Sequence, residues 1–229
     1  VVDGFTFSID EGIKNMKESI QTHSQIDQKF LDFWRCLCIC HDVIQVKMKD
    51  QTESYQGASM DEVTFLEMCK SVGFCSFIER NSDCITINIQ GQVEKYHILK
   101  VMEFTSTRKK MSVIVKGDSD NKVFNFIKGA DMAIIPIISE SGKHTSNKTI
   151  SCMNQIAAKG YRTLMFAYKE LDESLDADQL KDINENELDK DVELLGITGL
   201  EDMLQQDVQT CIRDFRNAQI KVWMLTGDK

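Results

Sequence analysis

The chain has 229 residues, of which 42% are hydrophobic, and its formal net charge at pH 7 is −9. This length and composition allow a packed core in one large domain or in two unequal ones. The acidic charge argues against binding of nucleic acid or of an anionic membrane as a bulk property, and no apolar run approaches the roughly 18 residues of a membrane span, so we expect a soluble segment.

The N-terminal third carries an unusual run of cysteines. Residues 1–29 are polar and predict a flexible entry segment; 30–46 predict a buried helix and 47–55 a loop. Cys36, Cys38 and Cys40 recur at every second residue in that helix, whereas zinc sites usually need a gap of two to four residues and a second, distant pair. Among the eight cysteines we therefore expect buried, reduced thiols and no metal site.

A second helix is predicted from its end signals. Ser59 stands where an N-cap belongs, and Glu62, three residues on, completes a capping-box pattern. Apolar residues follow at helical spacing as far as Gly73, which suits a C-cap.

After Gly73 the apolar period changes to two. Residues 84–89 and 95–101 alternate around a turn at 91–92, and residues 110–116 and 122–128 flank the polar stretch 117–121. Two consecutive hairpins predict an antiparallel sheet.

The segment from Asp131 to residue 168 predicts mixed structure. A helical region beginning at Asp131 is disturbed by Pro136, the single proline of the chain. Residues 139–149 predict a polar loop, 150–159 a helix that stops at Gly160, and 161–168 a strand.

The last sixty residues differ from the rest of the chain in composition and in the elements they predict. The strongly acidic stretch 169–193 predicts a solvated amphipathic helix with its flanks. Strand 194–198, helix 207–218 and strand 220–225 together predict a βαβ-type unit. We therefore expect two domains, residues 1–192 and 193–229.

The final strand runs directly into Thr226, Gly227 and Asp228. An α/β sheet presents ligand sites at the carboxyl ends of its strands in this way. A site that stops there is half built, so we expect the chain to be a piece of a larger protein.

Seven short segments resemble one family when taken in order: the P-type ATPases, and within them the P4 group of phospholipid flippases. Glu-Phe-Thr-Ser-Thr-Arg-Lys-Lys-Met-Ser-Val, for example, is similar to the family's Glu-Phe-Thr-Ser-Asp-Arg-Lys-Arg-Met-Ser-Val. The segments are residues 40–43, 55–63, 103–113, 128–131, 160–164, 201–205 and 226–229. The resemblance covers about residues 30–229.

The resemblance implies the fold and the partners. Residues 1–192 would be the nucleotide-binding domain, an α+β fold with an antiparallel β-sheet flanked by helices. Residues 193–229 would be a fragment of the Rossmann-like (haloacid-dehalogenase-like) phosphorylation domain. It implies ATP and Mg²⁺ as ligands and a cytosolic domain of an integral membrane protein. The partners would be the phosphorylation, actuator and transmembrane domains of the parent, a phospholipid substrate and a possible accessory subunit, with no nucleic acid.

Four residues would form the centre of the nucleotide site. Phe104 offers a flat apolar partner for adenine, and Glu62 could accept a hydrogen bond from the exocyclic amine. Lys128 and Arg162 supply cations for the phosphates, since arginine binds phosphate oxygens in bidentate fashion. Ser106 is a further contact candidate near Phe104.

Each of these residues also has an ordinary structural interpretation. Phe104 could be plain core, Glu62 only a cap partner, Lys128 a residue flanking a turn and Arg162 an exposed strand-end charge. The resemblance favours the nucleotide site in each case. In the whole enzyme it also places Thr226, Gly227 and Asp228 at the γ-phosphate and the phosphorylated aspartate.

Departures from the family pattern keep other functions open. Met60 replaces a proline, Thr107 an acid and Met203 a cation. The sequence has no Asp-Lys-Thr-Gly-Thr segment, so we expect no catalytic residue here. The alternative is a non-catalytic, nucleotide-sensing module of a signalling protein, such as the guanylyl cyclases of some protozoa. A haloacid-dehalogenase-type phosphatase fits poorly, because its nucleophilic aspartate motif is also missing.

Overall fold

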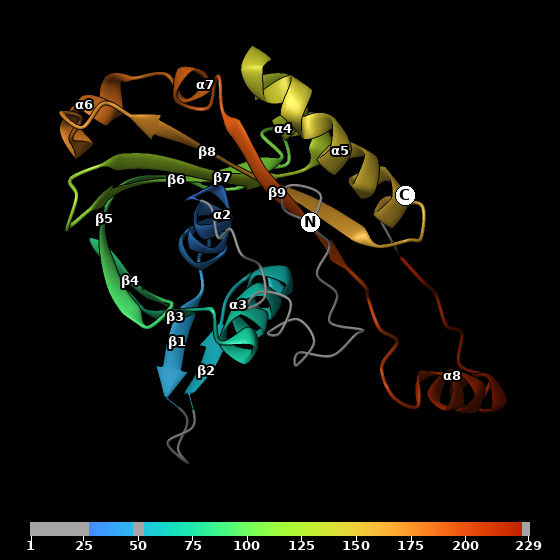
Figure 1. Cartoon of the computed structure of the whole chain (residues 1–229). Coiled ribbons are helices and arrows are strands. Elements are labelled where there is room, and N and C mark those ends of the chain that lie inside the picture. Colours follow the sequence, from blue (N-terminus) through green and yellow to red (C-terminus); the bar gives the residue numbers. More distant parts are fainter. Residues whose placement is uncertain (1–27, 48–52, 226–229) are drawn as a thin grey trace.

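The protein is built around one curled antiparallel sheet, seen in a computed structural model that describes residues 28–47 and 53–225 (Figure 1). Seven strands follow one another across this sheet in chain order. They are β3 (Cys75–Arg80), β4 (Cys84–Ile89), β5 (Gln92–Met102), β6 (Lys110–Gly117), β7 (Val123–Gly129), β8 (Arg162–Leu171) and β9 (Glu193–Leu200). The expected α+β class is confirmed.

Helices cover both faces of the sheet. In Figure 1 the strands curl around α2 (Gln28–Ile39), with α3 (Met60–Val72) beside it, while α4 (Asp131–Ile134) and α5 (Glu140–Ala157) lie on the other face. The largest core cluster surrounds Trp34 of α2, which is 1% exposed. A second cluster lies under α4 and α5.

Both predicted hairpins are confirmed, because their turns have the required chemistry. Gln90 and Gly91 join β4 to β5, and both have positive φ angles, 52° and 85°. A two-residue turn with positive φ at both positions matches the right-handed twist of the flanking strands. β6 and β7 pair from Lys110 opposite Gly129 to Lys116 opposite Val123.

The N-terminal helix is shorter than expected. It ends at Ile39, and β1 (Ile44–Lys47) pairs antiparallel with β2 (Glu53–Gln56), so the prediction of helix to 46 and loop over 47–55 is wrong for these residues. Apolar Ile44 and Val46 alternate with polar neighbours, a period that suits a strand. Most of the expected flexible entry segment lies outside the described residues.

The second helix is confirmed at both ends, but its cap differs. α3 follows Ser59 and ends at Gly73, which has the left-handed φ of 74°. Ser59 makes no side-chain cap hydrogen bond. Its expected partner Glu62 turns to other groups, described below, so the capping box is wrong.

α5 and its surroundings correct a second expectation. The region from Asp131 is helical, and Pro136 falls in a 3₁₀ turn, Ile135–Ile137, as expected. α5 starts ten residues earlier than predicted, at Glu140, where the hydroxyl of Ser139 accepts from the amide of Gly142 at 3.1 Å. Residues 140–149 are therefore helix and not loop.

The acidic segment is only partly solvated. It forms the end of β8 and the short helices α6 (Ala177–Asp182) and α7 (Glu185–Leu188). Leu180 and Leu188 are buried against Met102, Ile114 and Val123 in a third core cluster. The segment is thus a packed cover for one face of the sheet.

The predicted C-terminal βαβ unit does not form in the described residues. β9 pairs antiparallel with β8, and residues 220–225 form no strand. α8 (Val208–Asn217) has no buried residue, and it lies away from the sheet in Figure 1. A boundary at residue 192 would cut between two paired strands, so the pairing favours a boundary after Leu200. The division into two domains itself stays a prediction.

Within the described residues, no helix has the length and apolarity needed to cross a membrane. Cys36, Cys38, Cys40, Cys69 and Cys75 are free and buried, as expected for small core residues.

Candidate functional site

One edge of the sheet gathers the predicted site residues. β5 ends there at Met102, β6 begins at Lys110, β7 ends at Gly129 and β8 begins at Arg162. The antiparallel register places these ends side by side, with Lys110 opposite Gly129 and Gly129 opposite Met165. Residues separated by up to sixty positions in the chain therefore meet along one rim.

Phe104 is not a core residue. Its side chain is 62% exposed, in the loop 103–109 between β5 and β6. Two hydrogen bonds within the loop fold it. The amide of Lys109 donates to the carbonyl of Thr105 at 2.8 Å, and the amide of Arg108 donates to the Thr105 hydroxyl at 3.0 Å. Ser106, in the same loop, is also exposed. The loop thus presents an aromatic face to solvent.

Lys128 and Glu62 form a buried ion pair beside this rim. Lys128 is 8% exposed on β7, and its ammonium donates to a carboxylate oxygen of Glu62, which is 9% exposed on α3. The other oxygen of Glu62 accepts from the backbone amide of Asp42 at 3.0 Å. A charge pair at this depth is stable only when both members have partners. Glu62 consequently ties α3, β7 and the turn after α2 together.

The imidazole of His41 lies in the turn after α2 and is uncharged. Burial, with the charges of Lys128 and Arg80 adding to it, lowers the pKa of His41 from 6.5 to about 3. The amide of Val43 donates to Nδ1 at 3.0 Å, so Nε2 carries the proton and donates to the carbonyl of Cys38 at 2.8 Å. His41 therefore adds no positive charge beside Lys128.

Arg162 is exposed and forms ion pairs with two carboxylates. Its guanidinium donates to both oxygens of Asp61, at 2.9 and 3.1 Å, and to Asp202 at 2.5 Å. Exposed pairs of this kind are worth about 1 kcal/mol or less. An incoming phosphate could displace them at little cost.

Lys109 is a further candidate residue for the site, and the sequence analysis did not single it out. It has a left-handed φ of 54°, its carbonyl accepts from the amide of Ala130 at 3.0 Å, and its exposed side chain reaches Met132 at 3.1 Å. These contacts hold a cation across the end of β7, in the loop that carries Phe104. The signal for it was the Arg-Lys-Lys run directly after the expected adenine contacts.

Three further observations concern the extent of the site. A cavity of about 230 Å³, lined by Arg35, Glu94, Lys122 and Tyr168 among others, lies at the opposite edge of the sheet and contains none of the predicted residues. Thr226, Gly227 and Asp228 lie outside the described residues, so their expected role stays a prediction. No group of three or more metal-binding side chains occurs in the described residues.

The arrangement suits a ligand with an aromatic base and several negative charges. The exposed ring of Phe104 can stack on a base, because every base has a π-face. Lys109, Lys128 and Arg162 supply positive charge along the same rim, and charge-assisted hydrogen bonds to phosphate are among the strongest available.

Comparisons with known proteins identify the family of the chain. The family model described as P-type ATPase, cytoplasmic domain N, matches residues 29–207. "Probable phospholipid-transporting ATPase 12" of Arabidopsis thaliana is 37% identical over 252 residues, covering 100% of this chain and 21% of the relative. "Phospholipid-transporting ATPase FetA" of Mus musculus and "Phospholipid-transporting ATPase ID" of Homo sapiens are each 34% identical, covering 86% of this chain and 18% of the relative.

The chain thus spans about a fifth of the length of the curated relatives it matches. The family model covers most of the chain, including all seven strands of the large sheet. The chain belongs to the P-type ATPases, in their P4, phospholipid-transporting branch.

Proposed function

We propose that this chain is the cytosolic ATP-binding module of a P4-type ATPase that couples ATP hydrolysis to phospholipid translocation. The observation that carries the proposal is the exposed ring of Phe104 at the same sheet edge as the Lys128–Glu62 pair and Arg162. The ring of Phe104 is 62% exposed and lies at the same edge as these cations, so it is available to stack on the base of a charged nucleotide.

Different residues of the site would bind different parts of the nucleotide. The adenine stacks on Phe104, with Ser106 close by in the same loop. Glu62 can accept from the exocyclic amine, because each carboxylate oxygen offers two lone pairs and its present partners leave some free. Lys128 is bonded to Glu62 and so lies with it at the adenine end, while Lys109 and Arg162 face the phosphates. Mg²⁺ would be carried by the phosphate oxygens, whose charge it neutralises.

The chemistry takes place elsewhere in the parent protein. The attacking aspartate of an Asp-Lys-Thr-Gly-Thr segment is not in this sequence, so this module binds ATP and delivers it. The phosphorylation domain would receive the γ-phosphate as an aspartyl phosphate, and the actuator and transmembrane domains would use that intermediate to move a phospholipid, with or without an accessory subunit.

ATP titration of the chain, followed by calorimetry or by NMR, tests the proposal. We expect saturable binding with a Kd between about 0.1 and a few mM, since only part of the phosphate contacts are present, and no steady hydrolysis. Phe104→Ala should weaken binding by about 1–3 kcal/mol, the range for a lost base stack. Phe104→Tyr should retain it.

Val93→Ala is the matched control, because Val93 is 64% exposed on β5 at the opposite edge of the sheet. It should bind ATP as the unmodified chain does. Absence of saturation at several millimolar ATP, or normal binding by a folded Phe104→Ala variant, would refute the proposal. Sustained phosphate release would show that the chain itself catalyses hydrolysis.

A further inference from the structure

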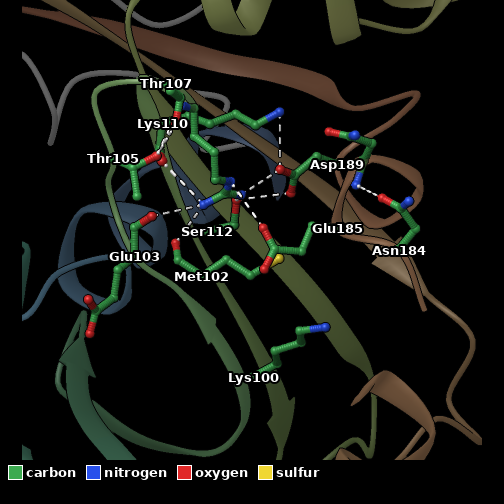
Figure 2. Close-up of polar contacts among 12 residues, drawn as sticks. Lys100, Met102, Glu103, Thr105, Thr107, Lys110, Ser112, Asn184, Glu185 and Asp189 are labelled. Atoms are coloured by element: carbon green, nitrogen blue, oxygen red, sulfur yellow. Dashed lines mark hydrogen bonds and ion pairs between the residues drawn. The ribbon is translucent and has the colours of Figure 1, made fainter. Parts of the chain in front are cut away.

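Asp189 is a buried carboxylate that lies among polar side chains of β6, such as Lys110 and Ser112 (Figure 2). Asp189 is 1% exposed and follows α7. Four side chains donate to it from loop 103–109 and from β6 and β7. They are Arg108 at 2.7 Å, Lys110 at 3.1 Å, the hydroxyl of Ser112 at 2.9 Å and the amide of Asn125 at 3.2 Å.

Arg108 connects this carboxylate to both ends of the loop. One guanidinium nitrogen bonds Asp189, while another donates to the carbonyls of Met102 at 2.8 Å, Glu103 at 3.0 Å and Lys110 at 3.3 Å. These carbonyls are where β5 enters the loop and β6 leaves it. A single planar cation therefore ties the two ends of the loop together, with Phe104 directly after the entry point.

The segment that carries Asp189, residues 172–191, is itself held in place by packing and hydrogen bonds. Besides the packing of Leu180 and Leu188, Lys100 of β5 donates to the carbonyl of Leu180 at 2.7 Å, and Asn125 donates to the carbonyl of Leu188 at 3.0 Å. Glu185 of α7 adds a half-exposed contact to Arg108 at 3.4 Å. The segment 172–191 can thus serve as a fixed anchor for the loop.

We infer that Asp189 is a positioning residue for the adenine-binding loop: it fixes Arg108, and Arg108 fixes the backbone that presents Phe104. The ligand in this inference rests on the proposed function, but the mechanical coupling between Asp189 and the loop does not. Segment 172–191, eighty residues away in the chain, would then set how well the loop is organised for a nucleotide.

The test compares Asp189→Asn with Glu94→Gln. Glu94 is the matched control, because it holds Arg35 through two hydrogen bonds, at 2.7 and 2.9 Å, at the opposite edge of the sheet. Hydrogen exchange without ATP should become about tenfold faster at residues 103–109 in Asp189→Asn, the equivalent of one lost charge-assisted hydrogen bond. Affinity for ATP should fall by a similar factor, and Glu94→Gln should change neither quantity more than twofold.

Arg108→Lys gives a second, graded variant. Lysine keeps the charge but cannot span Asp189 and three carbonyls at once, so we expect an intermediate rise in loop exchange. If Asp189→Asn fails to fold, this variant decides the question. Ser112→Ala removes a donor to Asp189 and an acceptor of Arg108 at 3.1 Å, but it leaves the Arg108–Asp189 ion pair and the three carbonyl contacts of Arg108 in place. Loop exchange should therefore rise less in Ser112→Ala than in Asp189→Asn.

The results of these experiments distinguish the positioning role of Asp189 from the proposed binding of ATP. Unchanged loop exchange in folded Asp189→Asn or Arg108→Lys, or an equal rise in Glu94→Gln, would overturn the inference and leave Asp189 a purely structural residue. Failure of the unmodified chain to bind ATP would overturn the proposed function, while the exchange measurements would still decide the coupling.

Discussion

His41 shows how one buried residue can make the stability of the whole fold depend on pH. The ring packs edge-on against Phe77 at 4.7 Å between centroids and is almost fully buried. Its pKa of about 3 in the folded chain lies below the ordinary 6.5. Above pH 6.5 both the folded and the unfolded chain carry a neutral imidazole, so His41 causes no pH dependence there. Between 6.5 and 3 only the unfolded chain binds a proton, so stability falls as the pH falls.

This linkage predicts a measurable difference between two histidine variants. Lowering the pH from 7.5 to 5 should cost the unmodified chain about 2 kcal/mol of unfolding free energy through His41, at about 1.4 kcal/mol per pH unit. His41→Gln should lose most of this pH dependence in urea unfolding curves. His97→Gln, at a half-exposed histidine, should retain it. An unchanged pH dependence in His41→Gln would contradict the assignment.

The Lys128–Glu62 pair should behave as a unit in folding. Lys128→Met leaves a buried carboxylate without its cation, which should lower the free energy of unfolding by about 3 kcal/mol. Adding Glu62→Gln should restore much of the loss, because no unpaired charge then remains. Chemical denaturation of the two single variants and the double variant measures this coupling. Strictly additive effects would mean that the two side chains act independently.

The residues of the candidate site were predictable in part. Phe104, Lys128 and Arg162 were expected from short motifs, and the structure brings them to one edge. Arg108 and Asp189 were not expected, because their partnership joins residues 81 positions apart and no local pattern encodes it. The true partners of Glu62 were missed for the same reason, since the local capping-box pattern suggested a different one.

At the scale of elements, the sequence predicted strands correctly where apolar residues recurred with a single period. The alternation in β4 to β7 predicted both hairpins. The first half of α5 was missed because Ser, Thr, Asn and Gly have low helix propensity. Buried Ser146 and Thr149 show that packing compensates there. β9 was recognised as a strand but assigned to the wrong unit, since its apolar pattern does not say which strand it pairs with.

The close approach of β6 and β7 at the site edge gives a prediction about a single methyl group. A Cβ on Gly129 would lie 2.7 Å from the carbonyl oxygen of Lys109 and 2.7 Å from Cβ of Lys110. Gly129→Ala should therefore lower stability by about 1–3 kcal/mol, as overpacking does. It should also displace the loop and weaken ATP binding.

Gly91→Ala is the control for this change. Gly91 has a φ of 85°, so alanine is strained there, but no atom lies within 4 Å of the added Cβ. It should lower thermal stability by about 1 kcal/mol without changing ATP affinity. Equal ATP affinity in the two alanine variants would contradict the role given to the contact between Gly129 and Lys109.

At the scale of the whole molecule, the described part of the chain divides into a packed sheet and an unpacked tail. Residues 201–225 contain no buried side chain, and Trp223, Met224 and Leu225 are each more than 80% exposed. Seven ordered motifs were enough to identify the family from sequence. The position at which the packed part ends was not predictable, because it depends on the pairing of β9.

This division predicts a step in amide protection after Leu200. Amides of α8 should exchange much faster than those of β6 and β7, because the helix has no buried contacts to hold it closed. β9 should be protected like the rest of the sheet. Hydrogen-exchange mass spectrometry measures both. Protection in α8 equal to that in β6 would show that the tail packs against a surface in solution.

The distribution of thiols has a practical consequence for spectroscopy. All eight cysteines lie within the described residues, and Cys211 of α8 is the exposed one, while the others are buried or half-buried. Burial also raises the pKa of thiols such as Cys36 and Cys69, which suppresses the reactive thiolate. A maleimide dye added in limiting amount would therefore mark Cys211 without removal of any other cysteine, and energy transfer from it would follow the tail when neighbouring parts of a longer protein are present.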